Sequence, residues 1–170
     1  MRHFYIVVDS MLLLKPFKFE QVNILLQWIA DDTERILWSG NTFDGGLTPL
    51  SFRIHLSRND LRAFSLSTFN GKLVAYGELV IKSDQVGTLC RVLVDPKARR
   101  RGYGKMLCEK LIDFAQQELK MKHLNLNTLS SNAAAISCYQ SLGFHIIKTL
   151  SQSRTIGKKS VDLIIMGKDL

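Results

Sequence analysis

Proline, cysteine and long apolar runs are all scarce in this chain of 170 residues. The longest apolar runs, Phe4–Val8 and Met11–Leu14, are far shorter than the ~20 residues that a membrane-spanning helix needs. The first run follows Arg2, as in a secretion signal, but Asp9 interrupts it and no small-residue cleavage site follows. We therefore expect a cytoplasmic protein with no membrane association.

The few cysteines, histidines and prolines exclude several other classes of protein. The three cysteines are an odd number, widely spaced in apolar segments, which is typical of free buried thiols and not of a disulfide framework. None of the four histidines has the His-Glu-x-x-His spacing of a zinc site, so we expect no metal. The three prolines fall between predicted elements, at Pro16, Pro49 and Pro96. No linker divides the chain, which predicts one domain over residues 11–170 behind a dispensable extension, residues 1–10.

Acidic residues are also fewer than basic ones, 15 against 23, and the net charge is +8. Such an excess suits an anionic partner, which includes nucleic acid, an anionic lipid and a phosphate-rich cofactor. The position of the charges along the chain has to decide among these three.

Hydrophobic periodicity and turn residues predict a mixed chain of the order β-α-α-β-β-β-α-β-α-β-β. The expected strands span about 11–15, 63–69, 73–81, 88–94, 123–128, 144–150 and 161–168. The expected helices span about 19–30, 49–56, 102–120 and 132–142, and 31–38 is helical or irregular. Asn70 and Gly71 form a strong hairpin signal between the second and third strands. The long helix 102–120 is a crossover, so strands 88–94 and 123–128 should be parallel and the rest of the sheet antiparallel.

The segment after strand 88–94 carries the clearest chemical signal. Five of the nine residues Lys97–Lys105 are cationic and none is acidic. Gly102 and Gly104 allow a close backbone approach, and the first turn of the following helix presents free N–H groups. Together these features predict a cradle for a phosphate-bearing ligand.

Two common phosphate-binding motifs do not fit this segment. A P-loop needs a glycine where Arg99 stands, and a dinucleotide fingerprint needs a third glycine where Leu107 stands. The dinucleotide motif also expects an acidic residue after the next strand, and none is found there.

Two other blocks match one known family. Residues 99–104, Arg-Arg-Arg-Gly-Tyr-Gly, resemble the pyrophosphate signature Gln/Arg-x-x-Gly-x-Gly/Ala of the Gcn5-related N-acetyltransferase (GNAT) superfamily. The strand before them ends in Val-x-Val-Asp-Pro, like the family's cofactor strand. Residues 132–144 are similar to a second family block, Asn-x-x-Ala-x-x-x-Tyr-x-x-x-Gly-Phe. The motifs cover roughly residues 88–144, and the element order extends the resemblance to the whole chain.

The resemblance implies a fold and an activity. The fold is α+β with three α/β/α layers, and its mixed, mostly antiparallel twisted sheet has a central parallel pair of strands that splay apart. The activity is direct transfer of an acetyl group from acetyl-CoA, the co-substrate, to a primary amine of a small molecule, a protein N-terminus or a lysine. We expect a monomer or a homodimer.

Individual roles also follow from the resemblance. The strand Val92–Val94 should bind the pantetheine arm through its backbone, with the N–H near Leu93 polarising the acetyl carbonyl. Asn132 should lie near the pantetheine, and Tyr139 should protonate the departing thiolate, although a core tyrosine is the alternative interpretation. The expected cofactor-binding residues are Val92, Leu93, Val94, Arg99, Arg100, Arg101, Gly102, Tyr103, Gly104, Lys105 and Asn132.

The general base departs from the family pattern. Some members have a glutamate at the start of the cofactor strand, where this chain has Thr88. Glu78 on the preceding strand is the nearest acidic candidate, although it also suits a surface or strand position. A water chain that ends on backbone carbonyls, or on Asn125 and Asn127, is the alternative.

The acceptor is shaped in the family by the segment that here spans residues 22–62. Its aromatic residues and acids suit a cationic amine, such as an aminoglycoside, a polyamine, a small amine or a protein N-terminus. These residues are Trp28, Trp38, Phe43, Phe52, Asp31, Asp32, Glu34 and Asp44.

A rival interpretation is a binding module. The chain would then be an inactive CoA-sensing domain or a basic nucleic-acid-binding protein. Tyr103 is the one aromatic residue of Lys97–Lys105, so base stacking has little support there and nucleic acid is disfavoured.

Overall fold

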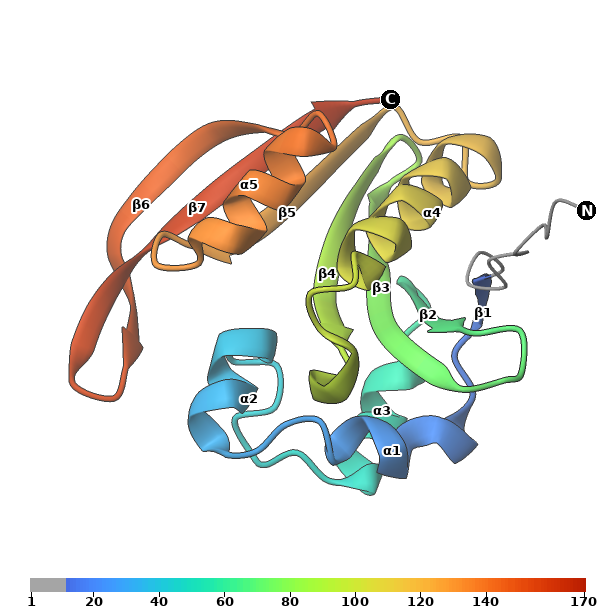
Figure 1. Ribbon diagram of the computed structural model, residues 1–170. Coiled ribbons are helices and arrows are strands. Elements are labelled where there is room, and N and C mark those ends of the chain that lie inside the picture. Colours follow the sequence, from blue (N-terminus) through green and yellow to red (C-terminus); the bar gives the residue numbers. More distant parts are fainter. Residues whose placement is uncertain (1–11) are drawn as a thin grey trace, which may run out of the picture.

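The computed structural model describes residues 12–170, which form an open, seven-stranded mixed sheet of order β1-β2-β3-β4-β5-β7-β6 (Figure 1). The strands are β1 Leu13–Pro16, β2 Leu61–Ser67, β3 Leu73–Ser83, β4 Val86–Val94, β5 His123–Leu129, β6 His145–Ile156 and β7 Lys159–Asp169. The helices are α1 Val22–Leu26, α2 Asp32–Ser39, α3 Pro49–Leu56, α4 Tyr103–Gln117 and α5 Ala133–Ser141, with short 3₁₀ turns at Phe19–Gln21 and Pro96–Ala98. The predicted extension, residues 1–10, and the start of the first predicted strand lie outside the described residues.

The predicted strand directions are confirmed. Strands β4 and β5 are parallel and are joined by α4, whereas every other neighbouring pair in the described sheet is antiparallel. A parallel pair needs such a crossover, because its strands run in the same direction. The hairpin between β2 and β3 is also as predicted, with Gly71 N–H donating to the Thr68 carbonyl at 2.9 Å.

Two apolar clusters cover the two faces of the sheet and make the predicted three layers. The larger cluster lies under α4, which buries Leu107, Cys108 and Leu111, and α5 packs against it through Ile136 and Tyr139. The second cluster lies under the first three helices and joins residues that include Leu25, Phe52 and Tyr76. None of the described helices is long and apolar enough to span a membrane.

The first predicted helix is too long. Residues 19–30 form a 3₁₀ turn and the short helix α1, which ends at Leu26. The helical spacing of Val22, Leu25, Leu26 and Ile29 predicted the buried side only in part: Val22 and Leu25 are buried, whereas Leu26 and Ile29 are half-buried. The chain leaves the helix early because the next one begins at once: Asp31 accepts from Glu34 N–H at 2.8 Å, and Ala30 N–H donates to the Glu34 carboxylate at 2.9 Å.

The last two strands are longer than predicted. Strand β6 continues to Ile156 and β7 begins at Lys159, whereas apolar alternation ends near Leu150. Backbone pairing resumes at Arg154 after an irregular stretch. The resulting long hairpin reaches toward α2 (Figure 1), and β6 contacts that helix.

The packing of α4 on the sheet gives a stability prediction. Leu111 is fully buried, so Leu111→Ala leaves a cavity and should reduce the free energy of unfolding by about 2–5 kcal/mol. Glu109→Ala, at an exposed position of the same helix, should change it by less than about 0.5 kcal/mol. Urea unfolding measures both values. Equal effects of the two substitutions would contradict the packing described here.

Candidate active site

Strands β4 and β5 part in the middle of the sheet. They pair only over Val86–Leu89 and His123–Leu126. Beyond that point β4 continues beside β3, and β5 continues beside β7. The two strands therefore diverge, and a cavity of about 750 Å³ lies where their pairing has ended.

Five parts of the chain line this cavity. Strands β4 and β5 supply two walls, α5 and its N-terminal loop supply a third, and α2 and the β6–β7 hairpin close the remaining side. The lining consists of residues 36–42, 88–92 and 127–129, with Ser131, Asn132, Tyr139, Arg154, Ile156 and Leu163.

A β-bulge shapes β4 where it lines the cavity. Cys90 pairs with Glu78 and Leu93 pairs with Tyr76, so Arg91 and Val92 face a single residue of β3. Arg91 has a φ of 49°, which is the left-handed region that residues with a side chain seldom adopt. Two features hold it there: the indole N–H of Trp38 donates to its carbonyl at 2.9 Å, and its side chain pairs with Glu78.

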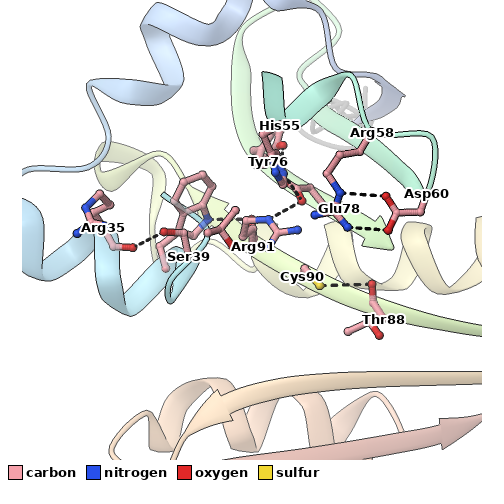
Figure 2. Close-up of polar contacts among 12 residues, drawn as sticks. Arg35, Ser39, His55, Arg58, Asp60, Tyr76, Glu78, Thr88, Cys90 and Arg91 are labelled. Atoms are coloured by element: carbon pink, nitrogen blue, oxygen red, sulfur yellow. Dashed lines mark hydrogen bonds and ion pairs between the residues drawn. The ribbon is translucent and has the colours of Figure 1, made fainter. Parts of the chain in front are cut away.

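Glu78 is the centre of a buried polar network on β3 (Figure 2). Its carboxylate lies 2.5 Å from Arg91 Nε, 3.0 Å from His55 Nε2 and 2.5 Å from the Tyr76 hydroxyl, which donates to it. Burial, followed by the neighbouring Glu78 charge, raises the pKa of Tyr76 well above its usual value. These contacts offset the free-energy cost of burying the charged Glu78 carboxylate.

This position argues against Glu78 as a base that contacts substrate. Of the two alternatives for Glu78, a strand position is confirmed and a surface position is wrong, because the residue lies on β3 and is 0% exposed. Glu78 is also not among the residues that line the cavity. The two asparagines of the alternative are also separated. Asn127 lines the cavity, whereas Asn125 lines a smaller one at the opposite end of β5.

Asn132 lies at the start of α5, and Tyr139 lies on the inner face of this helix. Asn132 caps the helix, with its side chain accepting from Ala135 N–H at 3.2 Å. Tyr139 packs against the core cluster and lines the cavity. Burial, followed by the charges of neighbouring thiols, raises the pKa of Tyr139 above its usual value. Its hydroxyl therefore stays protonated near neutral pH and can act as an acid.

The predicted anion cradle lies beyond the end of β4. Gly102 caps α4 with a φ of 79°, and a side chain there would meet only Met106, at 4.0 Å. The five cations of Lys97–Lys105 are exposed, and none forms an ion pair with another described residue. The Tyr103 ring is buried in the core, so this residue can offer a ligand its backbone N–H but not its ring.

The structure thus brings some predicted residues together and separates others. Val92, Asn132 and Tyr139 line one cavity. Leu93 and Val94 follow on the same strand but pack into the two core clusters. Sequence reasoning missed Arg91 and Arg154, because long-range packing brings them to the cavity and no local motif contains them.

The prediction that aromatic and acidic side chains of residues 22–62 form the acceptor surface is wrong for this cavity. Trp38 lines it, but the other three aromatic residues are buried in the second cluster, and none of the four acids lines it. The acids are engaged locally instead. Asp31 and Glu34 make the cap of α2, while Asp32 and Asp44 lie 2.6 and 3.8 Å from Arg35.

Comparison with known proteins agrees with this geometry. The profile of the family described as "Acetyltransferase (GNAT) family" matches residues 24–144. The ribosomal protein bS18-alanine N-acetyltransferase of Escherichia coli is 41% identical over 78 residues, which are 46% of this chain and 51% of that protein. The enzyme of the same name from Salmonella typhimurium is 35% identical over 108 residues, 64% of each chain. The chain spans about half the length of most of the curated relatives it matches.

Solved structures are similar over almost the whole chain. The ribosomal-protein-S18-alanine N-acetyltransferase of Escherichia coli has a TM-score of 0.74 at 25% identity and covers 94% of both chains. The spermidine N-acetyltransferase of Vibrio cholerae, in complex with CoA and spermine, has a TM-score of 0.82 and covers 95% and 96%. At 15% identity, the second likeness concerns the fold alone.

The buried ion pair gives a testable prediction. Glu78→Gln keeps the shape but removes the charge that faces Arg91, whose side chain is 10% exposed. An unpaired buried cation should lower the free energy of unfolding by about 3–5 kcal/mol. Adding Arg91→Met removes the second charge and should restore most of that loss. Urea unfolding of the wild type, the single variant and the double variant measures the difference. A double variant no more stable than the single one would show that the pairing is unimportant.

Proposed function

Because the chain belongs to the acetyltransferase (GNAT) family, we propose that it transfers the acetyl group of acetyl-CoA to the α-amine of a polypeptide. The observation that carries this proposal is the cavity where strands β4 and β5 diverge, which Tyr139 lines, together with the basic N-terminus of α4, which follows β4 along the chain. The relatives named for an alanine of ribosomal protein bS18 support the acceptor class, because the only amine of alanine is its α-amine.

We assign the phosphate end of acetyl-CoA to the loop and first turn of α4. Gly102, Tyr103, Gly104 and Lys105 offer backbone N–H groups at the positive end of the helix. Arg99, Arg100 and Arg101 add exposed positive charge next to them. A pyrophosphate at this position satisfies both the free N–H groups and the unpaired cations.

The pantetheine arm then follows the free edge of β4 into the cavity. The backbone of Val92–Val94 faces the space left by β5 and supplies hydrogen bonds that a neighbouring strand would otherwise make. A backbone N–H near Leu93, at the end of the bulge, is positioned to stabilise the oxygen of the tetrahedral intermediate. Asn132 borders the same space.

The chemistry is a direct displacement. The amine nitrogen bonds to the acetyl carbon, the carbon–sulfur bond breaks, and the Tyr139 hydroxyl gives its proton to the sulfur. Tyr139 then regains a proton from solvent. The amine loses a proton to water held at Asn127 and Thr128, which line the cavity. Glu78 acts at a distance, by fixing the bulge through Arg91. Orientation of the two reactants supplies much of the rate.

The phosphate assignment predicts a selective loss of affinity. Gly102→Val should abolish CoA binding, because the new side chain fills the open space beside the helix N-terminus. Gly71→Val is a matched control, since Gly71 also has a positive φ, 86°, and no atom lies within 4 Å of the place that a Cβ would take. Calorimetric titration with CoA and thermal unfolding test both variants. Unchanged affinity in Gly102→Val, or equal loss in the control, would overturn the assignment.

The Tyr139 assignment predicts a loss of turnover. Tyr139→Phe removes one proton and keeps the ring, so turnover should fall by about 10²–10⁴-fold while acetyl-CoA affinity hardly changes. Because burial raises the pKa of Tyr139, turnover in the wild type should show no alkaline loss from this group below about pH 10. Thiol release followed across pH measures both effects. Turnover within about twofold of wild type would remove Tyr139 from the mechanism.

A further inference from the structure

The charged residues of the cavity are all of one sign. Arg91 and Arg154 line it, and no aspartate, glutamate or lysine does so among the described residues. The rest of the polar lining is neutral. It includes serine, threonine and asparagine side chains on α2, on the loop after it, on β4, and on β5 with the loop that follows, as well as Trp38, Cys90 and Tyr139. Such groups hydrogen-bond to peptide N–H and carbonyl groups, but they do not neutralise a cation.

The two arginines differ in what they can offer a ligand. The charge of Arg91 is compensated within the protein, because its Nε pairs with Glu78 at 2.5 Å. Its Nη1 donates to Thr42 at 3.2 Å, and its buried Nη2 has no partner among the described residues. Arg154 is exposed and donates only to the neighbouring Ser153 carbonyl, at 3.1 Å. No described acid forms an ion pair with Arg154. The uncompensated charge of the cavity is therefore that of Arg154.

The hairpin around Arg154 strengthens this positive field. Residues 154–159 include Lys158 and Lys159 and contain no acid, and all three cations are exposed. Asp162, the acid of the following strand that is nearer to this turn, accepts from Gln152 N–H at 2.8 Å. Strand β6 contacts α2, and of these three cations Arg154 is the one that lines the cavity, with Lys158 and Lys159 farther along the hairpin.

We propose that the acceptor is a polypeptide with an acidic residue a few positions after its N-terminus, and that Arg154 binds this carboxylate. The proposal rests on the function given above and narrows its acceptor. A polyamine has cations along its whole length and meets no carboxylate in this cavity, so it is a poor acceptor. Arg154 is a specificity-determining residue that acts on binding and not on the acetyl transfer itself.

Short synthetic peptides test this proposal directly. Each begins with alanine, ends in an amide to remove the terminal carboxylate, and carries Asp, Asn or Lys at position two, three or four in a background of Ser and Gly. Thiol release from acetyl-CoA gives kcat/KM for each peptide and for spermidine. At one position at least, the Asp peptide should exceed the Lys peptide about tenfold, because attraction in one and repulsion in the other each contribute up to about fivefold. The difference should lie in KM.

Charge reversal supplies the decisive comparison. Arg154→Glu should invert the order, so that the Lys peptide exceeds the Asp peptide. Arg62→Glu changes the net charge equally but lies on β2, where Arg62 is exposed and donates to the Asn59 carbonyl at 2.9 Å. This control should keep the wild-type order of preference.

The outcomes distinguish a failure of the Arg154 assignment from a failure of the proposed function. Equal rates for Asp and Lys peptides in the wild type, an unchanged order in Arg154→Glu, or spermidine as the best acceptor would each overturn the role of Arg154 and leave acetyl transfer standing. No acetylation of any peptide or of spermidine, together with no binding of acetyl-CoA, would overturn the proposed function itself.

Discussion

The end of the pairing between β4 and β5 is the constraint on which the rest of the site depends. A strand that loses its neighbour leaves backbone N–H and carbonyl groups without partners. Here each strand keeps its other neighbour, β3 or β7, so the sheet stays continuous while its centre opens. The opening thus results from the pattern of strand pairing, and it creates both a cavity and a free strand edge at the same place.

Contacts with neighbouring elements, above all with β3, fix the conformation of β4 where it diverges from β5. A left-handed residue in mid-strand is unfavourable, and Arg91 is held in that conformation by contacts from α2 and β3. Trp38 of α2 donates to its carbonyl. Glu78 of β3 pairs with its side chain, and His55 of α3 in turn bonds to Glu78 (Figure 2). A buried charge cluster of this kind is weak evidence for stability. It does fix one geometry of the strand that faces the cavity.

The excess of positive charge is divided between two places with different consequences. The loop before α4 combines cations with free helix N–H groups, which suits a compact phosphate. The β6–β7 hairpin has cations but no helix terminus, and its Arg154 lines the cavity. The acids of the second helix are engaged by its cap and by Arg35, so they do not offset the hairpin charge. The net charge of +8 therefore includes two separate groups of cations, one suited to a phosphate and one on the hairpin that borders the cavity.

Local sequence determined the parts of this protein whose conformation depends on near neighbours. The β2–β3 hairpin, the glycine cap of α4 and the Asn132 cap of α5 all follow from residues within a few positions of one another. The parallel direction of β4 and β5 follows from the helical crossover that joins them, a longer pattern that is also readable along the chain. Tertiary structure alone decided why Glu78 is buried and which side chains share the cavity. Trp38, Arg91 and Arg154 are far apart in the chain, and only the packing of α2, β4 and β6 gives them common surroundings. The physical reason is that turns and caps are short-range hydrogen bonds, whereas a cavity is the space left after distant surfaces have packed.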